Sequence, residues 1–278
     1  MITKPFRLVL IFAFAGFVLP VGADAGNKAI IVTYNVLADP IYKKQRIPEL
    51  LKILGESNAD IIALQEVAPW FIEEVGKAEW FKSYYVPIEA NEIVNPRGLL
   101  ILSREPVTQI EYDLLPGNQM RAYLIVSTTI KGHNFKVATC HLESPLDAGE
   151  TRARQLDVLF EKLADAEHVL LSGDFNFGDH EQPETAHLSD EYYDLWSKTN
   201  KWKKGYTWNI KKSKMAWNGS FRNEISRRID RILIKSDKTI PVKSKIIGDR
   251  PLDKRKVVFP SDHFGLYGTV TIDDSDSY

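Results

Sequence analysis

The stretch HVLLSGDFNF, residues 168–177, places a carboxylate and an amide at the end of an apolar run. Residues 169–171 are typical of a buried strand, whereas Asp174 and Asn176 each stand directly before a phenylalanine. Burying such polar groups without partners costs several kcal/mol, so they need a ligand or each other. Because side chains alternate along a strand, we expect both phenylalanines to pack inward while Asp174 and Asn176 share the opposite face.

Polar residues also occur where other apolar segments begin or end. Besides the Asp174 pair, they are Asn35 in TYNV, Glu66 in LQEV, His141 and Glu143 in HLES, Asp230 in RIDRI, and Asp262 and His263 in SDHFGL. Each alone has an ordinary explanation: a turn, a surface histidine, or a salt bridge to a neighbouring arginine. Their recurrence predicts one shared site, since strand ends converge in a sheet.

These residue types favour a hard cation. Carboxylates and amides without cysteine suit Mg²⁺ or Mn²⁺, which leaves coordination positions for water and for phosphate oxygens. Two histidines beside it could stabilise charge on a phosphoryl group or protonate a leaving group. Zinc is disfavoured because the chain has neither a His-x-x-x-His pair nor a second cysteine. No P-loop is present, so nucleoside triphosphate hydrolysis is unsupported.

Strand-like and helix-like segments are mixed along the whole chain. Apolar spacing predicts helices near 47–54, 69–81 and 156–163. The strand-like segments are 29–36, 59–67, 97–104, 123–130, 133–140, 168–173, 227–234 and 264–272. This mixture, without an evident linker, predicts an α/β or α+β fold around one core, as a single domain over residues 26–278.

The first 25 residues have the layout of a secretory signal peptide. Lys4 and Arg7 precede an apolar run, which is followed by an Ala-x-Ala sequence. We therefore expect a secreted or periplasmic protein without a membrane span after processing; the alternative is an uncleaved anchor. Cys140 is the only cysteine among 278 residues, so no intrachain disulfide can form. Nothing indicates a coiled coil, and a monomer is expected.

The near-neutral net charge of −1 conceals a strong asymmetry. Residues 197–256 hold 19 Lys and Arg against 5 Asp and Glu, whereas residues 26–196 hold 15 against 27. Such a basic segment predicts a nucleic acid or another phosphate-rich partner, although solvated lysine-rich loops are the alternative. Tyr206 and Trp208 interleave with the lysines, and their rings could stack on bases.

Six motifs in order, TYNV, LQEV, HLES, GDFN, RIDRI and SDHFGL, resemble the endonuclease/exonuclease/phosphatase superfamily. The resemblance covers about residues 29–272. It implies a four-layer sandwich in which two mixed β-sheets lie face to face between outer helices. It also implies a metal-dependent hydrolase of phosphoester bonds.

The resemblance implies roles for the motif residues. Glu66 would bind the catalytic Mg²⁺, Asn35 would help to hold the metal and phosphate, and Asp262 would support the metal side. Asp174 would orient and deprotonate the attacking water, which Asn176 would help to hold. His141 and His263 would donate hydrogen bonds to the phosphate oxygens. Asp230 would hydrogen-bond His263 and keep it oriented.

Within the superfamily, the stretches TCHLES, YTW and FPSDHFGL most resemble tyrosyl-DNA phosphodiesterases, which implies a DNA substrate. Those enzymes carry a phosphate-contacting arginine two residues after the asparagine of GDxN, where this chain has Gly178. Arg121 or a lysine of the basic segment is expected to replace it. The alternatives are a general secreted endonuclease or exonuclease, or a phosphatase acting on inositol phosphates or phospholipids.

Overall fold

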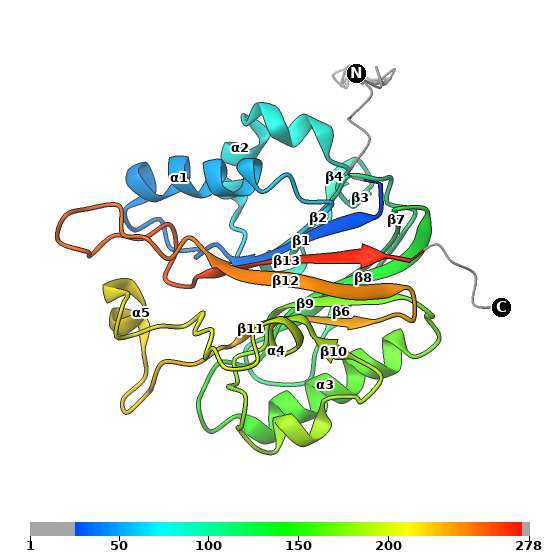
Figure 1. The fold of residues 1–278 in the computed structure, drawn as a ribbon. Coiled ribbons are helices and arrows are strands. Elements are labelled where there is room, and N and C mark those ends of the chain that lie inside the picture. The colour runs from blue at the N-terminus through cyan, green and yellow to red at the C-terminus, as the bar shows by residue number, and fades with distance from the viewer. Residues whose placement is uncertain (1–25, 274–278) are drawn as a thin grey trace, which may run out of the picture.

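The computed structural model describes residues 26–273, so the expected signal peptide at 1–25 lies outside the described residues. Two mixed β-sheets lie face to face, with helices on both outer faces (Figure 1). The helices are α1 (Lys43–Glu56), α2 (Pro69–Gly76), α3 (Gly149–Leu163), α4 (Leu195–Thr199) and α5 (Lys214–Gly219), and the 3-10 turns are η1 (Glu79–Ser83), η2 (Pro96–Gly98) and η3 (Glu184–His187). No described helix has the length and apolar character needed to cross a bilayer.

The first sheet has five strands in the order β12-β13-β1-β2-β5. Its members are β1 (Lys28–Asn35), β2 (Ile61–Gln65), β5 (Leu100–Ser103), β12 (Thr239–Ile247) and β13 (Gly265–Ile272). Only β1 and β2 pair in parallel; the other neighbours are antiparallel. A short hairpin, β3 (Ile88–Glu89) with β4 (Glu92–Ile93), stands apart from both sheets.

The second sheet has six strands in the order β10-β11-β9-β8-β7-β6. Its members are β6 (Gln109–Leu114), β7 (Ala122–Ile130), β8 (His133–His141), β9 (Val169–Asp174), β10 (Tyr193–Asp194) and β11 (Asp230–Lys235). Here β8 and β9 form the parallel pair, again in the middle of an otherwise antiparallel sheet.

Three apolar clusters hold the four layers together. Inward residues of both sheets form the central cluster, which includes Ile31, Ile101, Val126 and Leu170. A second cluster packs α1 and α2 on the outer face of the five-stranded sheet. A third packs α3 on the six-stranded sheet. This arrangement confirms the expected four-layer fold, and burial of alternate strand residues on both faces explains why most strands read as continuous apolar runs.

A polar bridge joins the sheets beneath the strand ends. The Gln65 amide Nε2 donates to Thr33 Oγ1 at 3.2 Å and, across the interface, to Thr139 Oγ1 at 2.9 Å. All three side chains are fully buried. Since β1 and β2 belong to one sheet and β8 to the other, this bridge fixes the position of one set of strand ends against the other.

The expected strands and helices are present, but several elements had no strong signal in the sequence. The edge strands β6 and β12 are largely exposed, so they lack the apolar runs by which the central strands were found. The 69–81 segment is not one helix: α2 ends at Gly76 and η1 follows. The short helices α4 and α5, of which α5 lies within the lysine-rich segment 197–256 and α4 overlaps its start, were not predicted from the sequence.

Candidate active site

Adjacent strands of the six-stranded sheet bring three predicted residues into one row. His141 lies beside Asp174 in the parallel pair of β8 and β9, and Asp230 lies beside Asp174 in the pair of β9 and β11. In the facing sheet, Asn35 ends β1 beside Gln65, the last residue of β2. Residues from four motifs therefore meet at one end of the sandwich.

The Asp174 carboxylate is the centre of this cluster. Its Oδ2 accepts a hydrogen bond from Asn35 Nδ2 at 3.0 Å, and it lies 3.3 Å from His141 Nε2 and 3.6 Å from His263 Nε2. Its Oδ1 accepts the backbone N–H of Asn176 at 3.1 Å. The buried Asp174 carboxylate is therefore not left without partners, because its neighbours donate hydrogen bonds to both of its oxygens.

The two phenylalanines after Asp174 pack inward as expected, although β9 ends at Asp174 and the chain turns at Asn176. Phe175 and Phe177 are fully buried beneath α3, with ring centroids 6.1 Å apart. Asn176 lies between them with φ at 57°, and its Nδ2 donates to the Leu142 carbonyl at 2.9 Å. The apolar anchors on both sides hold this left-handed turn in place.

Glu66 follows β2 with φ at 57°, in the left-handed region that few non-glycine residues adopt. The turn directs its carboxylate toward Asn35 Nδ2 at 3.0 Å and the Ala38 backbone N–H at 3.1 Å. Gly98 makes room for it: a Cβ there would lie 3.3 Å from the Glu66 Cα, and the Gly98 carbonyl accepts Val67 N–H at 2.9 Å. Strained backbone of this kind, at about 1–3 kcal/mol, concentrates at functional sites.

The two histidines have opposite pKa shifts. Burial, with the positive charges of Arg121 and His263, lowers the pKa of His141 well below its usual value. Burial also disfavours charge on His263, but attraction to Asp230 and Asp174 outweighs it, so the pKa of His263 lies well above its usual value. At neutral pH His141 is therefore neutral, whereas His263 is an imidazolium whose Nδ1 donates to Asp230 Oδ2 at 3.0 Å.

Burial and the nearby Asp230 charge, opposed by His263, together raise the pKa of Asp174 to about 7. A carboxyl group that titrates near neutrality can accept a proton from water at physiological pH. The arrangement thus places a proton acceptor between one neutral and one charged imidazole.

Arg121 reaches the cluster through His141. Its Nη1 lies 3.0 Å from His141 Nδ1. Since a guanidinium only donates, Nδ1 is the acceptor and the proton of His141 sits on Nε2, facing Asp174. Gln119 Oε1 holds Arg121 in place by accepting from its Nε at 3.2 Å and from the Ser144 N–H and hydroxyl at 2.8 and 3.0 Å. The sequence analysis missed Gln119, whose only signal is its place two residues before Arg121.

These side chains open into a cavity of about 180 Å³. Its polar lining includes Glu66, Arg121, His141, Asp174, Asp262 and His263. The cavity lining therefore combines carboxylate oxygens with cationic and N–H groups. That combination suits a substrate oxyanion bound together with a metal ion.

The donor set fits a hard divalent cation. Burial raises the pKa of Asp262, and the charge of Glu66 raises it further, although His263 opposes both. Two partly buried carboxylates that repel each other favour a bound cation, and oxygen ligands suit Mg²⁺. The ligand atoms of Asp174, Asp230 and His263 also lie within 4.8 Å of one another. However, both ring nitrogens of His263 already face the carboxylates of Asp174 and Asp230. These three residues therefore form a hydrogen-bonded chain and not a metal site.

Two predicted residues are placed differently from the expectation. Asn35 does not line the cavity, and its Oδ1 accepts the Leu37 N–H at 3.1 Å, so it positions Glu66 and Asp174 instead of offering a free ligand oxygen. Trp208 does line the cavity but is 7% exposed, with its ring 4.9 Å from that of His263. This packing leaves little of the indole to stack on a base.

Tyr206 and Gly178 do not line the catalytic cavity; they belong to a neighbouring, larger pocket. Arg121 lines the catalytic cavity. Asp230 is not paired with its flanking arginines. Instead, Arg231 bonds Asp179, which leaves Asp230 to His263.

Comparison with known proteins decides the family. The model of the Endonuclease/Exonuclease/phosphatase family matches residues 32–263. The chain belongs to this family. The match confirms the resemblance seen in the motifs and agrees with the fold described above.

Within this family, the chain is similar to several proteins and solved structures that share one name. Tyrosyl-DNA phosphodiesterase 2 of Danio rerio is 29% identical over 255 residues, covering 87% of this chain and 67% of that protein. The Xenopus laevis protein of that name is 31% identical over 235 residues, covering 80% and 60%. The crystal structure of D. rerio TDP2 complexed with single strand DNA product has a TM-score of 0.73 at 26% identity, covering 88% and 99%. The chain thus spans about 60 to 67% of the length of these full-length relatives. The predicted enzyme class, a phosphoric diester hydrolase, is confirmed by these matches.

The expected secreted or periplasmic location was wrong. The relatives that match most of the chain are all named as enzymes of tyrosyl-DNA, a substrate that gives no support to export. The expectation rested only on residues 1–25, which lie outside the described residues.

Proposed function

We propose that this protein is an Mg²⁺-dependent phosphodiesterase that hydrolyses the bond between tyrosine and the 5′-phosphate of DNA. The observation that carries this proposal is the buried Asp174 carboxylate, held between His141 and His263 at the floor of a carboxylate-lined cavity. Such a site offers a base for water and donors for a phosphoryl group within a few ångströms of each other.

The residues divide the chemistry among them. Asp174 accepts a proton from the attacking water, and Asn176 Oδ1 accepts a hydrogen bond from the same water. The imidazolium of His263 and the Nε2–H of His141 donate to phosphoryl oxygens as their charge grows. Asp230 keeps His263 protonated and oriented, at 3.0 Å. These groups act together in one direct displacement at phosphorus.

The metal would be held by Glu66 and Asp262, whose carboxylates line the cavity. Mg²⁺, or Mn²⁺ in its place, supplies positive charge against the phosphoryl oxygens when bound. Arg121, which also lines the cavity, adds a second positive charge and takes the part that an arginine at position 178 would otherwise have.

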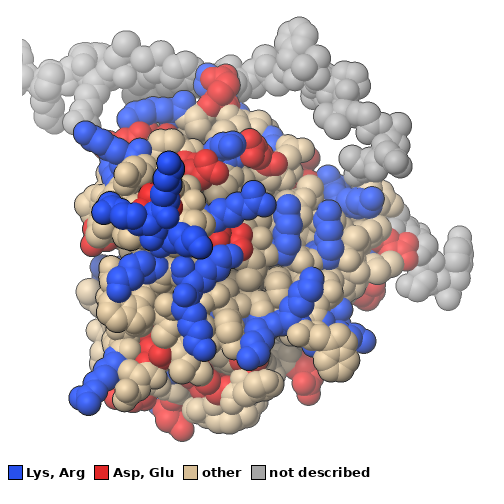
Figure 2. All heavy atoms as spheres, turned by 60° about the vertical axis from the view of Figure 1, so that its left-hand side comes forward, with Lys and Arg blue, Asp and Glu red and all other residues tan. Residues whose placement is uncertain are grey.

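Two observations support DNA as the substrate. The similar proteins are named tyrosyl-DNA phosphodiesterases, and one similar structure holds a single-strand DNA product. In addition, Lys and Arg side chains gather over the side of the molecule that carries α5 (Figure 2). Cationic surfaces of this kind attract nucleic acid backbones.

The test uses two oligonucleotides of one sequence, with a 5′-phosphotyrosyl end or a plain 5′-phosphate, incubated with the full chain and Mg²⁺ or with EDTA. We expect release of tyrosine from the first, an intact strand in both, and no reaction in EDTA. Ladders from both strands would indicate a general nuclease instead. If neither strand reacts, inositol phosphates and phospholipids become the substrates to test. Activity that survives EDTA would overturn the metal-dependent mechanism.

A further inference from the structure

The turn that follows β9 carries Asn176, and its backbone lies beyond the hydrogen-bonded part of the sheet. The last residue pair between β9 and β11 joins Asp174 to Asp230. Asn176 then adopts a left-handed φ of 57°, which needs surrounding contacts to hold it. The carbonyl groups of Asn176 and Phe177 lie past that last pair, so they need partners from elsewhere if the turn is to keep its shape.

Two arginines supply these partners. Arg227 Nη1 donates to the Asn176 carbonyl at 3.2 Å, and Arg231 Nη2 donates to the Phe177 carbonyl at 3.1 Å. The guanidinium of Arg231 also lies 4.7 Å from the centre of the Phe177 ring. Hydrogen bonds from a charged donor are stronger than those between neutral groups. The turn after β9 is therefore fixed by side chains at and just before the start of β11.

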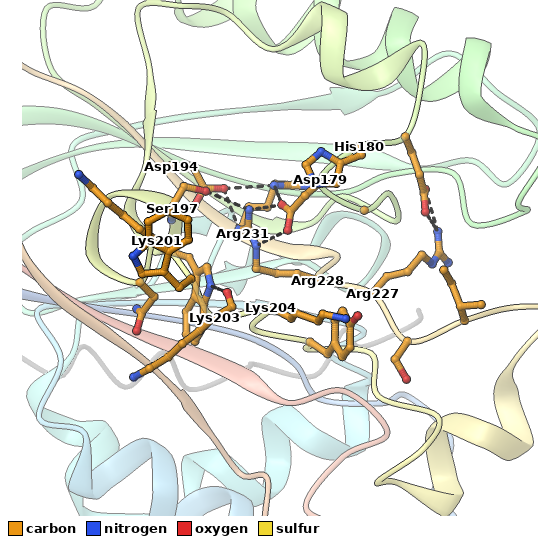
Figure 3. A pocket seen from close by; sticks show the side chains of 18 of the residues that line it. Asp179, His180, Asp194, Ser197, Lys201, Lys203, Lys204, Arg227, Arg228 and Arg231 are labelled. Atoms are coloured by element: carbon orange, nitrogen blue, oxygen red, sulfur yellow. Dashed lines mark hydrogen bonds and ion pairs between the residues drawn. The ribbon is translucent and has the colours of Figure 1, made fainter.

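Arg231 is itself held by ion pairs in the wall of a pocket of about 820 Å³ (Figure 3). Its Nη1 lies 3.0 Å from Asp179 Oδ1 and 3.2 Å from Asp194 Oδ2. Arg228 shares both aspartates: its Nη1 lies 2.7 Å from Asp194 Oδ2, and its Nη2 pairs with Asp179 Oδ1. Figure 3 shows both arginines facing these aspartates. Because the guanidinium is a rigid fork, one nitrogen fixed on two carboxylates directs the other toward the Phe177 carbonyl.

Arg227 is held in a similar way by two glutamates. Its Nη1 lies 3.0 Å from Glu181 Oε2, and its Nη2 pairs with Glu224 Oε1. A Cβ at Gly178 would lie 3.0 Å from Glu181 Oε1 and 3.7 Å from Arg227 Cβ. The ion pair between Arg227 and Glu181 therefore occupies the space beside Gly178, where the chain has no side chain.

These contacts leave one polar atom of Asn176 for the reaction. Its N–H donates to Asp174 Oδ1 at 3.1 Å, its Nδ2 donates to the Leu142 carbonyl at 2.9 Å, and its carbonyl accepts from Arg227. Among residues 26–273, no group donates to its Oδ1. Asn176 lines the catalytic cavity, so Oδ1 is the atom that can accept a hydrogen bond from the attacking water.

We propose that Arg231 and Arg227 are positioning residues, which hold the turn at residues 176–177 and thereby place Asn176 Oδ1 against the attacking water. Arg228 is the matched comparison. It is as buried as Arg231, with both side chains 2% exposed, and it shares both aspartates, but its remaining hydrogen bond goes to helix α4. This inference rests on the proposed function, which gives Asn176 its role at the water.

The first test compares Arg231→Lys with Arg228→Lys in the full chain with Mg²⁺, on the p-nitrophenyl ester of thymidine 5′-phosphate. Lysine keeps the charge that the two aspartates need but lacks the fork that reaches a further acceptor. Arg231→Lys should lower kcat by about tenfold or more with little change in KM, because misplacing a group that acts in the chemical step costs rate. Arg228→Lys should keep kcat near that of the wild type. Unchanged kcat in Arg231→Lys, or an equal loss in both variants, would overturn the inference.

A double-mutant cycle separates positioning from a general structural effect. Asn176→Ala removes the side chain through which Arg231 acts. On that background, Arg231→Lys should lower kcat by less than about twofold, because the effects of coupled residues do not add. If the two losses multiply in full, Arg231 acts by another route and the inference fails.

Hydrogen exchange followed by mass spectrometry gives a readout that needs neither substrate nor metal. Amides of residues 174–178 should exchange about tenfold faster in Arg231→Lys and Arg227→Lys than in the wild type, as expected for loss of one charge-assisted hydrogen bond. Arg228→Lys should match the wild type. Equal exchange in Arg231→Lys and Arg228→Lys would contradict the inference. If the wild type hydrolyses neither the ester nor tyrosyl-DNA, the proposed function falls, whereas the exchange rates still show whether these arginines hold the turn.

Discussion

At the residue scale, the two histidines of the site, His141 and His263, differ in protonation at neutral pH. The pKa of His141 is lowered by burial and Arg121, whereas that of His263 is raised because Asp230 and Asp174 outweigh its burial. Environments that drive pKa values apart in this way assign roles to the members of a site. One imidazole can donate as a neutral group, and the other brings a full positive charge.

Replacing Asp174 by asparagine should lower kcat on tyrosyl-DNA by about 100-fold or more, because the general base is lost. Asparagine has the same shape and can still accept the hydrogen bond from Asn35. The thermal midpoint is expected to fall, since the amide keeps only one of the two acceptor oxygens that Asn35 and the Asn176 N–H use, but the unfolding transition should stay cooperative. Steady-state kinetics together with thermal unfolding test this; a rate loss below tenfold would remove Asp174 from the role of base.

Replacing Asp230 by asparagine should shift the pH dependence of the reaction. The active form carries a protonated His263, so activity is lost as pH rises through the pKa of that imidazole. Without the Asp230 charge, burial lowers this pKa, and the falling limb of the kcat/KM profile should move to lower pH. The profile is measured on a small substrate, the p-nitrophenyl ester of thymidine 5′-phosphate. An unmoved limb would show that His263 is not held charged by Asp230.

At the element scale, the site exists because two parallel strand pairs lie in the middle of facing sheets. Asn35 ends β1 and Asp174 ends β9, and the Gln65 bridge to Thr139 locks the two ends together. In both strands the polar residue follows the last apolar side chain that packs between the sheets. Cross-sheet hydrogen bonds between buried groups resist sliding, since a shift would leave those groups unpaired.

Gly173 shows how close these strands must run. A Cβ at this position would lie 2.2 Å from the Cys140 carbonyl oxygen, a distance that no packing tolerates. Gly173→Ala should therefore destabilise the protein by about 1–3 kcal/mol or more, as overpacked core variants do. Gly76→Ala is the matched control, because a Cβ there would meet nothing within 4 Å. Urea unfolding of both variants decides; equal midpoints would contradict the tight approach of β8 and β9.

At the scale of the whole molecule, charge is divided between the two parts of the chain. Lys and Arg side chains gather over the side of the molecule that carries α5 (Figure 2), and residues 197–256, which include α5, hold the excess of Lys and Arg. The acidic excess lies in residues 26–196, which supply most of the other strands and helices. The fold thus turns a nearly neutral protein into one with a cationic side for a polyanion.

This division predicts a salt effect that depends on the substrate. Raising the salt concentration should increase KM for a tyrosyl oligonucleotide, because counterions compete with the lysines for backbone phosphates. KM for the small p-nitrophenyl ester should change much less, since it carries a single phosphate. Parallel kinetic measurements from low to high salt test this; the same salt response for both substrates would argue against a cationic strand-binding surface.

Some residues of the site could be predicted from the sequence alone, and others could not. Asp174, His141 and His263 were found because each interrupts an apolar strand with a chemically costly group, and that signal is local. Gln119 gave no such signal, because its role depends on where a loop places it beside Ser144 and Arg121. Trp208 looked like an exposed stacking ring, but its burial against His263 is a tertiary contact that no spacing reveals.

The sequence by itself determined the order of the strands along the chain, the polar residues at their ends and, through six motifs, the family. These are consequences of local alternation and residue chemistry. Only the tertiary structure decided which strand ends meet and how burial and neighbouring charge separate the pKa values of the two histidines. Those properties depend on distances between residues far apart in the chain, and packing alone sets such distances.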